Sequence, residues 1–294
     1  MTLWTDLTGV EFAVRFVDVT PSGWPADADV VPTRALVAGD GPDVVFTHGT
    51  SGHLEAFSRN VAVHVAAGYR VHAIDMLGHG YTGKPDQPYE IADYVAHLVG
   101  YLDAQGIERA HLVGESLGGW VSAVTAAQHP DRVASLQLIA PGGTKANPEI
   151  MERIKTSTRR AVMEDDVSLT RDRLHLLMAN PERDVSEELV QIRHAIYHTP
   201  EFQRNVDNLL SLQEMERRQR NLLRAEQMAE ITAPTLIVWG RQNPFGEVPE
   251  AQLMHESIPG SQLELFDECG HWPQHERADL YNPLSLEFLA KSSG

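Results

Sequence analysis

Short runs of apolar, β-branched residues alternate with longer stretches of helical periodicity from about residue 9 of the chain. The runs are typical of buried strands and lie at 43–48, 69–76, 109–114 and 133–140. Apolar residues at helical spacing fill the stretches between them, at about 54–67, 90–105 and 117–128. Gly106 and Pro130 follow two of these stretches and would end the helices there. Strict alternation of strand and helix predicts a parallel sheet covered by helices on both faces.

The alternation stops at about residue 146. The stretch 146–227 contains no glycine and no convincing strand, and its apolar residues, such as Leu189 and Ile192, recur at helical spacing. We interpret 146–227 as an α-helical insertion in a single domain, whose core consists of 1–145 and 228–294. Two further strand patterns and a last helix follow the insertion, at 235–240, 262–266 and about 276–290.

Composition and charge limit the kinds of binding partner that the chain is expected to have. Of the 294 residues, 42% are hydrophobic and 22% are charged, as in ordinary globular domains. The formal net charge is −17, so the chain has no basic excess with which to displace counterions from a phosphate backbone. We therefore expect a small-molecule partner and no nucleic acid partner.

The chain has one cysteine, Cys269, which excludes a disulfide framework and any multi-cysteine metal site and fits a reducing compartment. No apolar run approaches the roughly 20 residues that span a bilayer. The first residues also lack the basic and apolar regions of a signal peptide. We expect a cytoplasmic protein without a membrane partner, and the sequence leaves open whether its copies form a homo-oligomer.

The strongest chemical signal is the pentapeptide Gly-Glu-Ser-Leu-Gly at 114–118. It follows a predicted buried strand directly and precedes a predicted helix directly. In that setting the two glycines allow a tight turn that raises the hydroxyl of Ser116 above the edge of the sheet. The motif therefore predicts that Ser116 is a nucleophile.

A second strand end carries the loop His-Gly-Thr-Ser-Gly-His at 48–53. Small residues there allow a backbone N–H to point at a developing oxyanion, while the N–H of Leu117 supplies the second donor. Thr50 and Ser51 are both candidates for the first donor. Gly49, in the same loop, is expected to contact the substrate.

The general base is predicted to be His271, which follows the last strand pattern. It comes after the serine and the expected acid in the chain order serine, acid, histidine. The acid is expected after the strand at 235–240, but Asn243 occupies that place. An amide oxygen can accept a hydrogen bond from the imidazole but cannot stabilise imidazolium with a charge.

Three carboxylates are alternative candidates for the missing acid. They are Glu247 in the same loop, and Asp267 and Glu268 between the last strand and the histidine.

At these residues the chain resembles the α/β-hydrolase superfamily, and especially the meta-cleavage-product hydrolases. Members of that group cleave a carbon–carbon bond in ring-opened aromatic dienoates. The resemblance is most specific in FSRN followed by AAGYRV, in GESLGGW, and in ECGHWPQHERADLYN, at 57–60, 66–71, 114–120 and 268–282. It implies an eight-stranded, mostly parallel sheet with helices on both faces and makes the insertion a helical lid over the active site.

The resemblance also implies roles for further residues. It places Trp272 and Cys269 in the pocket beside the histidine. The lid arginine that steadies the substrate's enolate or carboxylate corresponds to Arg193. Glu115 stands where the relatives often have asparagine near the substrate carboxylate, and an ionised glutamate there would repel that group.

Metal and nucleotide sites are not expected. His194 and His198 lie four residues apart on a predicted helix, but the sequence offers no nearby third ligand. No glycine motif for a nucleotide follows a strand, so we expect no cofactor.

These observations together predict a cofactor-independent serine hydrolase. The leading reaction is cleavage of a carbon–carbon bond in a vinylogous 1,5-diketone, and hydrolysis of a carboxylic ester or lactone is the nearest alternative. Two other hypotheses are a cofactor-free dioxygenase, in which the histidine acts as a base, and a hydrolase-like small-molecule receptor.

Overall fold

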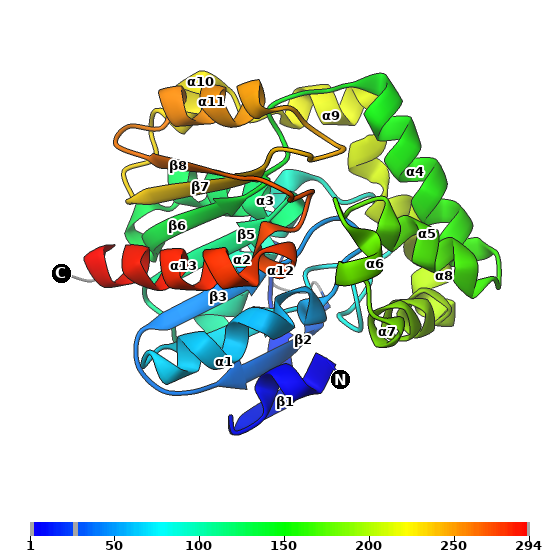
Figure 1. Cartoon of the computed structure of the whole chain (residues 1–294), viewed down its shortest axis with the longest axis horizontal. Helices are drawn as coiled ribbons and strands as arrows, with labels where there is room; N and C mark the ends of the chain where they lie inside the picture. The colour runs from blue at the N-terminus through cyan, green and yellow to red at the C-terminus, as the bar shows by residue number, and fades with distance from the viewer. Residues whose placement is uncertain (1–2, 26–28, 293–294) are drawn as a thin grey trace.

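The computed structural model describes residues 3–25 and 29–292. An eight-stranded sheet crosses the molecule in the order β1-β2-β4-β3-β5-β6-β7-β8 (Figure 1). The strands are β1 (Phe12–Val19), β2 (Val31–Ala38), β3 (Asp43–Thr47), β4 (Arg70–Ile74), β5 (Ala110–Glu115), β6 (Val133–Ile139), β7 (Thr235–Gly240) and β8 (Gln262–Phe266). Strand β2 pairs antiparallel with both β1 and β4, and all other pairings are parallel. The predicted mostly parallel, eight-stranded sheet is therefore confirmed.

All six strands that the pattern predicted are present, and their ends differ from the predicted ones by at most two residues. The pattern did not distinguish β1 and β2. Most of β1 is exposed, and it pairs with β2 at the edge of the sheet, so it lacks the continuous apolar run of a buried strand.

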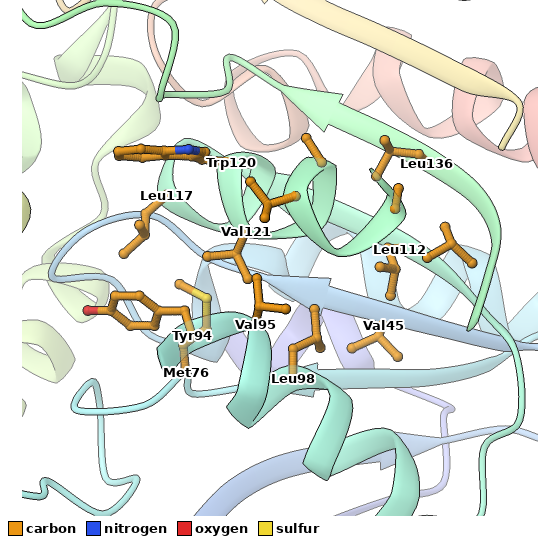
Figure 2. Packing of buried hydrophobic residues seen from close by; sticks show 14 of the residues in the cluster. Val45, Met76, Tyr94, Val95, Leu98, Leu112, Leu117, Trp120, Val121 and Leu136 are labelled. Atoms are coloured by element: carbon orange, nitrogen blue, oxygen red, sulfur yellow. The ribbon is translucent and has the colours of Figure 1, made fainter. Parts of the chain in front are cut away.

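Helices cover both faces of the sheet, as predicted (Figure 1). One face packs against α2 (Ile91–Ala104), α3 (Leu117–Gln128), α10 (Ala225–Met228) and α11 (Val248–Ser257). The other packs against α1 (Ser58–Ala66), α12 (Pro273–Glu276) and α13 (Ala278–Ser292). Figure 2 shows the first core, in which Val121 of α3 lies against Val95 of α2, with Trp120 of α3 on one side and Leu112 of β5 on the other. Burial of these apolar side chains holds the strand ends, and therefore the loops after them, in fixed positions.

Within the described residues, four short 3₁₀ helices complete the regular structure. They are η1 (Leu3–Leu7), η2 (Leu54–Phe57), η3 (Pro130–Arg132) and η4 (Ser211–Gln213).

Between β6 and β7 the chain forms helices and no strand, as the pattern of 146–227 predicted. They are α4 (Pro148–Met163), α5 (Val167–His175), α6 (Pro181–Asp184), α7 (Glu187–Tyr197), α8 (Pro200–Leu209) and α9 (Met215–Asn221), followed by α10, which packs on the sheet. Helices α4 to α8 gather at one end of the sheet, to its right in Figure 1. Tyr197, Phe202 and Val206 belong to a separate apolar cluster within this group of helices.

The carboxyl ends of β3 and β5 lie side by side, because Thr47 at the end of β3 pairs with Gly114 in β5. From β3 the chain passes to β4 on one side and later to β5 on the other. A reversal of this kind leaves a crevice between two diverging loops, where open α/β sheets bind their ligands. The loop 48–53 and Ser116 meet there.

Among the helices that the structure describes, none combines the length and the apolar character needed to cross a membrane.

Candidate active site

Ser116 occupies a strained turn between β5 and α3. Its backbone has φ 52° and ψ −110°, a conformation that non-glycine residues rarely adopt. The turn needs the glycines on either side: a Cβ on Gly114 would lie 2.3 Å from the carbonyl oxygen of Gly118, and one on Gly118 would lie 2.1 Å from that of Thr47. The strand–turn–helix setting expected for a nucleophilic serine is present.

The loop after β3 lies directly against this turn. The N–H of Gly118 donates to the carbonyl of His48 at 3.1 Å, and the N–H of Gly52 closes a turn on Gly49 at 2.9 Å. Thr50 lines the cavity beside Ser116. Leu117 lines it too, so both expected oxyanion donors border the space in front of the serine.

Ser51, the alternative oxyanion donor, lies deeper than Thr50. It is fully buried, and its hydroxyl accepts a hydrogen bond from the hydroxyl of Tyr197 at 3.0 Å. It is also absent from the residues that line the two cavities at the site, among those that the structure describes. The geometry therefore favours Thr50 over Ser51 as the first donor.

The His271 ring is held by Asn243. Nδ1 of His271 lies 2.9 Å from Oδ1 of Asn243, and the same oxygen accepts the N–H of Phe245 at 3.1 Å. Because the N–H of Phe245 requires the amide oxygen at that position, His271 must donate through Nδ1 and carry its lone pair on Nε2. This is the tautomer that a general base needs.

Burial, and secondarily the positive charge of Arg173, lowers the pKa of His271 to about 3. The imidazole is therefore neutral at pH 7 and ready to accept a proton.

Among the described residues, none of the three alternative acids contacts Nδ1 of His271. The side chain of Asp267 pairs with Arg241 at 2.9 Å, Glu268 is exposed, and Glu247 borders the cavity beside Ser116 as the N-cap of α11. Among the described residues, the partner of Nδ1 of His271 is the amide of Asn243, as the sequence pattern suggested.

Glu115 brings a carboxyl group to the other side of the imidazole. One of its oxygens lies 3.3 Å from Nε2 of His271, and the side chain is fully buried. Burial raises the pKa of Glu115 to about 8. The expected repulsion of a substrate carboxylate presupposed an ionised glutamate, whereas at pH 7 most of this carboxyl group is neutral.

Arg193 reaches the site from α7, as expected from the resemblance. It is buried, its Nε donates to Nε2 of His53 at 3.3 Å, and its guanidinium lies 5.2 Å from the ring centroid of Trp272. Nδ1 of His53 in turn lies 2.7 Å from a carboxylate oxygen of Glu55, which forms an ion pair with Arg34. A chain of buried polar groups thus ties α7 to the sheet.

Two cavities meet at Ser116 and His271. The larger has a volume of about 370 Å³, within the range of small-molecule sites, and is bordered by Trp120, Met151 and other apolar side chains. The smaller is about 20 Å³, room for about one water molecule, and is bordered by Arg193 and other residues around the base. Ser116 and His271 line both cavities and therefore stand between a large space, bordered by apolar and by charged side chains, and a small, positively charged one.

Sequence reasoning missed two buried arginines. Arg173 of α5 lines the small cavity, and Arg218 of α9 lines the large one with its guanidinium 4.5 Å from the ring centroid of Trp120. Burial lowers the pKa of each to about 10, which leaves both charged at pH 7. Each lies in a charged stretch of the sequence that is typical of a solvent-exposed helix face. Only the tertiary fold shows that these two arginines are buried.

Cys269 lies outside the pocket in which the resemblance placed it. Its side chain is buried in the apolar core that includes Val238 and Phe266. Among the described residues, the linings of the two cavities include Trp272 but not Cys269. Proximity in the chain to His271 therefore does not bring Cys269 to the pocket, because its side chain packs into the apolar core instead.

A third potential metal ligand does lie near the two histidines of α7. His194, His198 and Asp165 have ligand atoms within 4.8 Å of one another. The premise that no third ligand is near was therefore wrong. His198, however, directs Nδ1 at the carbonyl of His194 and Nε2 at that of Glu164, so both of its ring nitrogens already have partners.

Comparisons with known proteins agree with this geometry. Residues 42–278 match the family described as alpha/beta hydrolase fold. The chain is 34% identical over 261 residues to a 2-hydroxy-6-oxo-6-phenylhexa-2,4-dienoate hydrolase of Burkholderia cepacia, covering 86% of this chain and 89% of the relative. It is 35% identical over 263 residues to a 2-hydroxy-6-oxononadienedioate/2-hydroxy-6-oxononatrienedioate hydrolase of Comamonas testosteroni, with the same coverage.

Among solved structures, the chain resembles the 2-hydroxy-6-oxo-6-phenylhexa-2,4-dienoate hydrolase of a Rhodococcus species. The TM-score is 0.82 at 25% identity, and the match covers 96% of this chain and 99% of that one. The family match spans most of the chain, and the relatives above 30% identity cover most of it as well. The chain belongs to the α/β-hydrolase family.

Proposed function

We propose that this protein is a serine hydrolase that cleaves a carbon–carbon bond in a ring-opened aromatic dienoate, with no cofactor. The observation that carries the proposal is the position of Ser116, on a strained turn beside a correctly oriented His271 and at the junction of two unlike cavities. Relatives that share about a third of its residues are named as hydrolases of such dienoates.

His271 performs the proton transfers in this mechanism. It first helps to convert the dienol substrate to its keto form, which creates an electron sink for the later bond cleavage. It then takes the proton of Ser116 while the serine oxygen attacks the carbonyl next to the scissile bond. The N–H groups of Leu117 and Thr50 stabilise the resulting oxyanion. Cleavage releases the dienoate fragment, and water hydrolyses the acyl-serine.

The two cavities suggest how the substrate lies. Nη1 of Arg173 and Nη2 of Arg193 are buried and have no hydrogen-bond partner among the described residues, so the small cavity suits the substrate carboxylate. The large cavity suits the acyl group that stays on Ser116. A carboxylate needs more room than the small cavity offers, so we propose that the inserted helices act as a lid that moves when substrate enters.

The cellular setting is part of the proposal. The single cysteine is compatible with a reducing cytoplasm, and the acidic composition gives no reason to expect a nucleic acid partner.

The test compares the parent protein with Ser116→Ala, and with Ser257→Ala as a control at a half-buried serine of α11. Each is incubated with a phenyl-substituted dienoate, and loss of the dienoate absorbance and the masses of both products are measured. We expect the parent and the control to release a carboxylic acid and a hydroxydienoate, whereas Ser116→Ala releases neither.

Other outcomes would redirect the proposal. Turnover of esters or lactones but not of dienoates would favour an esterase. Oxygen uptake would indicate a dioxygenase, and tight binding without turnover would indicate a receptor.

A further inference from the structure

We propose that Glu115 supplies His271 with the negative charge that Asn243 lacks, from the opposite edge of the imidazole ring. Asn243 orients the ring through Nδ1, while the carboxylate of Glu115 stabilises the imidazolium that forms when Nε2 takes the proton of Ser116. The inference rests on the proposed serine mechanism and adds a catalytic residue to it.

The first support is the position of the Glu115 side chain. Its Oε1 lies 3.3 Å from Nε2, the atom of His271 that receives the proton. Glu115 precedes the nucleophile directly in the chain, and both of its carboxyl oxygens are buried. Among the described residues, the backbone N–H of Gly49 and the ring of His271 face these oxygens, and no side chain donates a hydrogen bond to them. A buried carboxyl group with so few partners is costly, so its presence at the reacting nitrogen indicates a role in the reaction rather than in folding.

The loop after β3 is shaped around this carboxyl group. A Cβ on Gly49 would lie 2.5 Å from one oxygen of Glu115 and 2.9 Å from the other. Any side chain at position 49 would therefore push the carboxyl group away from its place. The absence of a side chain on Gly49 is what lets Glu115 reach Nε2 of His271.

The charged groups around Glu115 set when it ionises. His271 faces it from the segment after β8, and the positive charges of Arg193 on α7 and Arg173 on α5 act on it from the inserted helices. The arginines favour the carboxylate, but burial outweighs them and raises the pKa of Glu115 to about 8. The charged, active form therefore becomes more abundant as the pH rises through about 8, whereas His271, with its pKa lowered to about 3, is already a free base.

The proton balance of the acylation step is simple. The O–H bond of Ser116 breaks, its proton moves to Nε2 of His271, and the serine oxygen forms a bond to the acyl carbon. The imidazolium then lies between the neutral oxygen of Asn243 and the carboxylate of Glu115. The bond between the acyl carbon and the leaving group then breaks, and His271 gives its proton to the leaving group. Glu115 stays charged throughout.

The test is a double-mutant cycle made of the parent, Glu115→Gln, Asn243→Asp and the double variant. Acylation is measured as the burst of 4-nitrophenol from 4-nitrophenyl acetate and as the rate of fluorophosphonate labelling, both from pH 6 to 10. These probes report on Ser116 and His271 without requiring a dienoate to be the substrate. Thermal unfolding of all four proteins measures any change in stability.

We expect Glu115→Gln to lower the acylation rate about 10²-fold and to remove the rise with pH that the parent shows around pH 8. Asn243→Asp should raise the rate of the parent below pH 8, where Glu115 is mostly neutral, and should restore most of the rate to the Glu115→Gln variant, since the aspartate returns the missing charge. Glu115→Asp should keep part of the rate together with the rise.

Several results would overturn the inference. Additive effects of the two substitutions would mean that the two positions do not share one electrostatic role. An acylation rate of the parent that does not rise around pH 8 would also contradict the role of Glu115. This result does not depend on whether any variant folds. If the parent is labelled normally but the effects of the two substitutions are additive, only the role of Glu115 is contradicted. If the parent is neither labelled nor able to cleave a dienoate, the proposed function is contradicted as well.

Discussion

The amide oxygen of Asn243 lies 2.9 Å from Nδ1 of His271 and 3.1 Å from the backbone nitrogen of Phe245. The two donors together fix which way the amide faces. Asn243 therefore selects the tautomer of the base without adding a charge to it, which separates two functions that a single aspartate usually combines.

Removing the amide should abolish this orientation. We expect Asn243→Ala to lower kcat about 10²-fold with little change in KM, because the ring can then rotate or carry its proton on Nε2. Steady-state kinetics on 4-nitrophenyl acetate measures the effect, with Arg241→Ala as an exposed control in the same loop. A change in KM alone would mean that Asn243 binds substrate rather than orienting the base.

Arg193 should recognise the substrate carboxylate. We expect Arg193→Met to raise KM for a dienoate at least tenfold, while its kcat on an uncharged acetate ester changes less than about twofold, because only the dienoate presents a carboxylate. Arg204→Met is the matched control, since Arg204 is an exposed arginine of α8. Equal losses on both substrates would assign Arg193 to the structure of the lid.

Arg218 should influence which acyl groups the large cavity accepts. Its buried guanidinium stacks on Trp120 and lies beside the space proposed for the acyl group. We expect Arg218→Met to lower kcat/KM about tenfold more for a dienoate with a carboxyalkyl ketone substituent than for one with a phenyl substituent. Competition between the two substrates, followed by mass spectrometry, gives the ratio directly. An unchanged ratio would exclude Arg218 from acyl-group selection.

Buried neutral histidines should make the fold sensitive to acid. Burial lowers the pKa of His97 to about 3, from about 6.5 in an unfolded chain, so below pH 6.5 the unfolded state binds the proton more readily. This contribution to stability is complete above about pH 6.5 and declines as the pH falls toward 3, by about 1.4 kcal/mol per pH unit.

Urea unfolding at several pH values measures that slope. We expect His97→Gln to show a shallower loss of stability between pH 6 and 4 than the parent. His255→Gln, at an exposed histidine, should keep the slope of the parent. Equal slopes for the parent and His97→Gln would show that protonation of His97 does not drive the loss.

Local sequence patterns were sufficient for six of the eight strands of the sheet and for four of the helices that cover it, α1, α2, α3 and α13. Strand β5 is buried along its whole length and therefore forms a continuous apolar run, whereas the largely exposed β1 carries no such signal. The positions of Ser116 and His271 were predictable for a related reason. Their motifs depend on glycines and strand ends that are adjacent in the chain, and the topology of a parallel sheet brings strand ends to one edge.

The sequence by itself therefore determined the fold class, the candidate nucleophile and base, and the amide in place of an acid. The tertiary structure decided which charged side chains are buried: it brings Glu115 to the second nitrogen of the base, directs Arg173 and Arg218 into the cavities, and turns Cys269 into the core. The physical reason is that burial and charge pairing depend on neighbours far away in the chain. A charged residue on a helix has the same local pattern whether it faces water or a cavity.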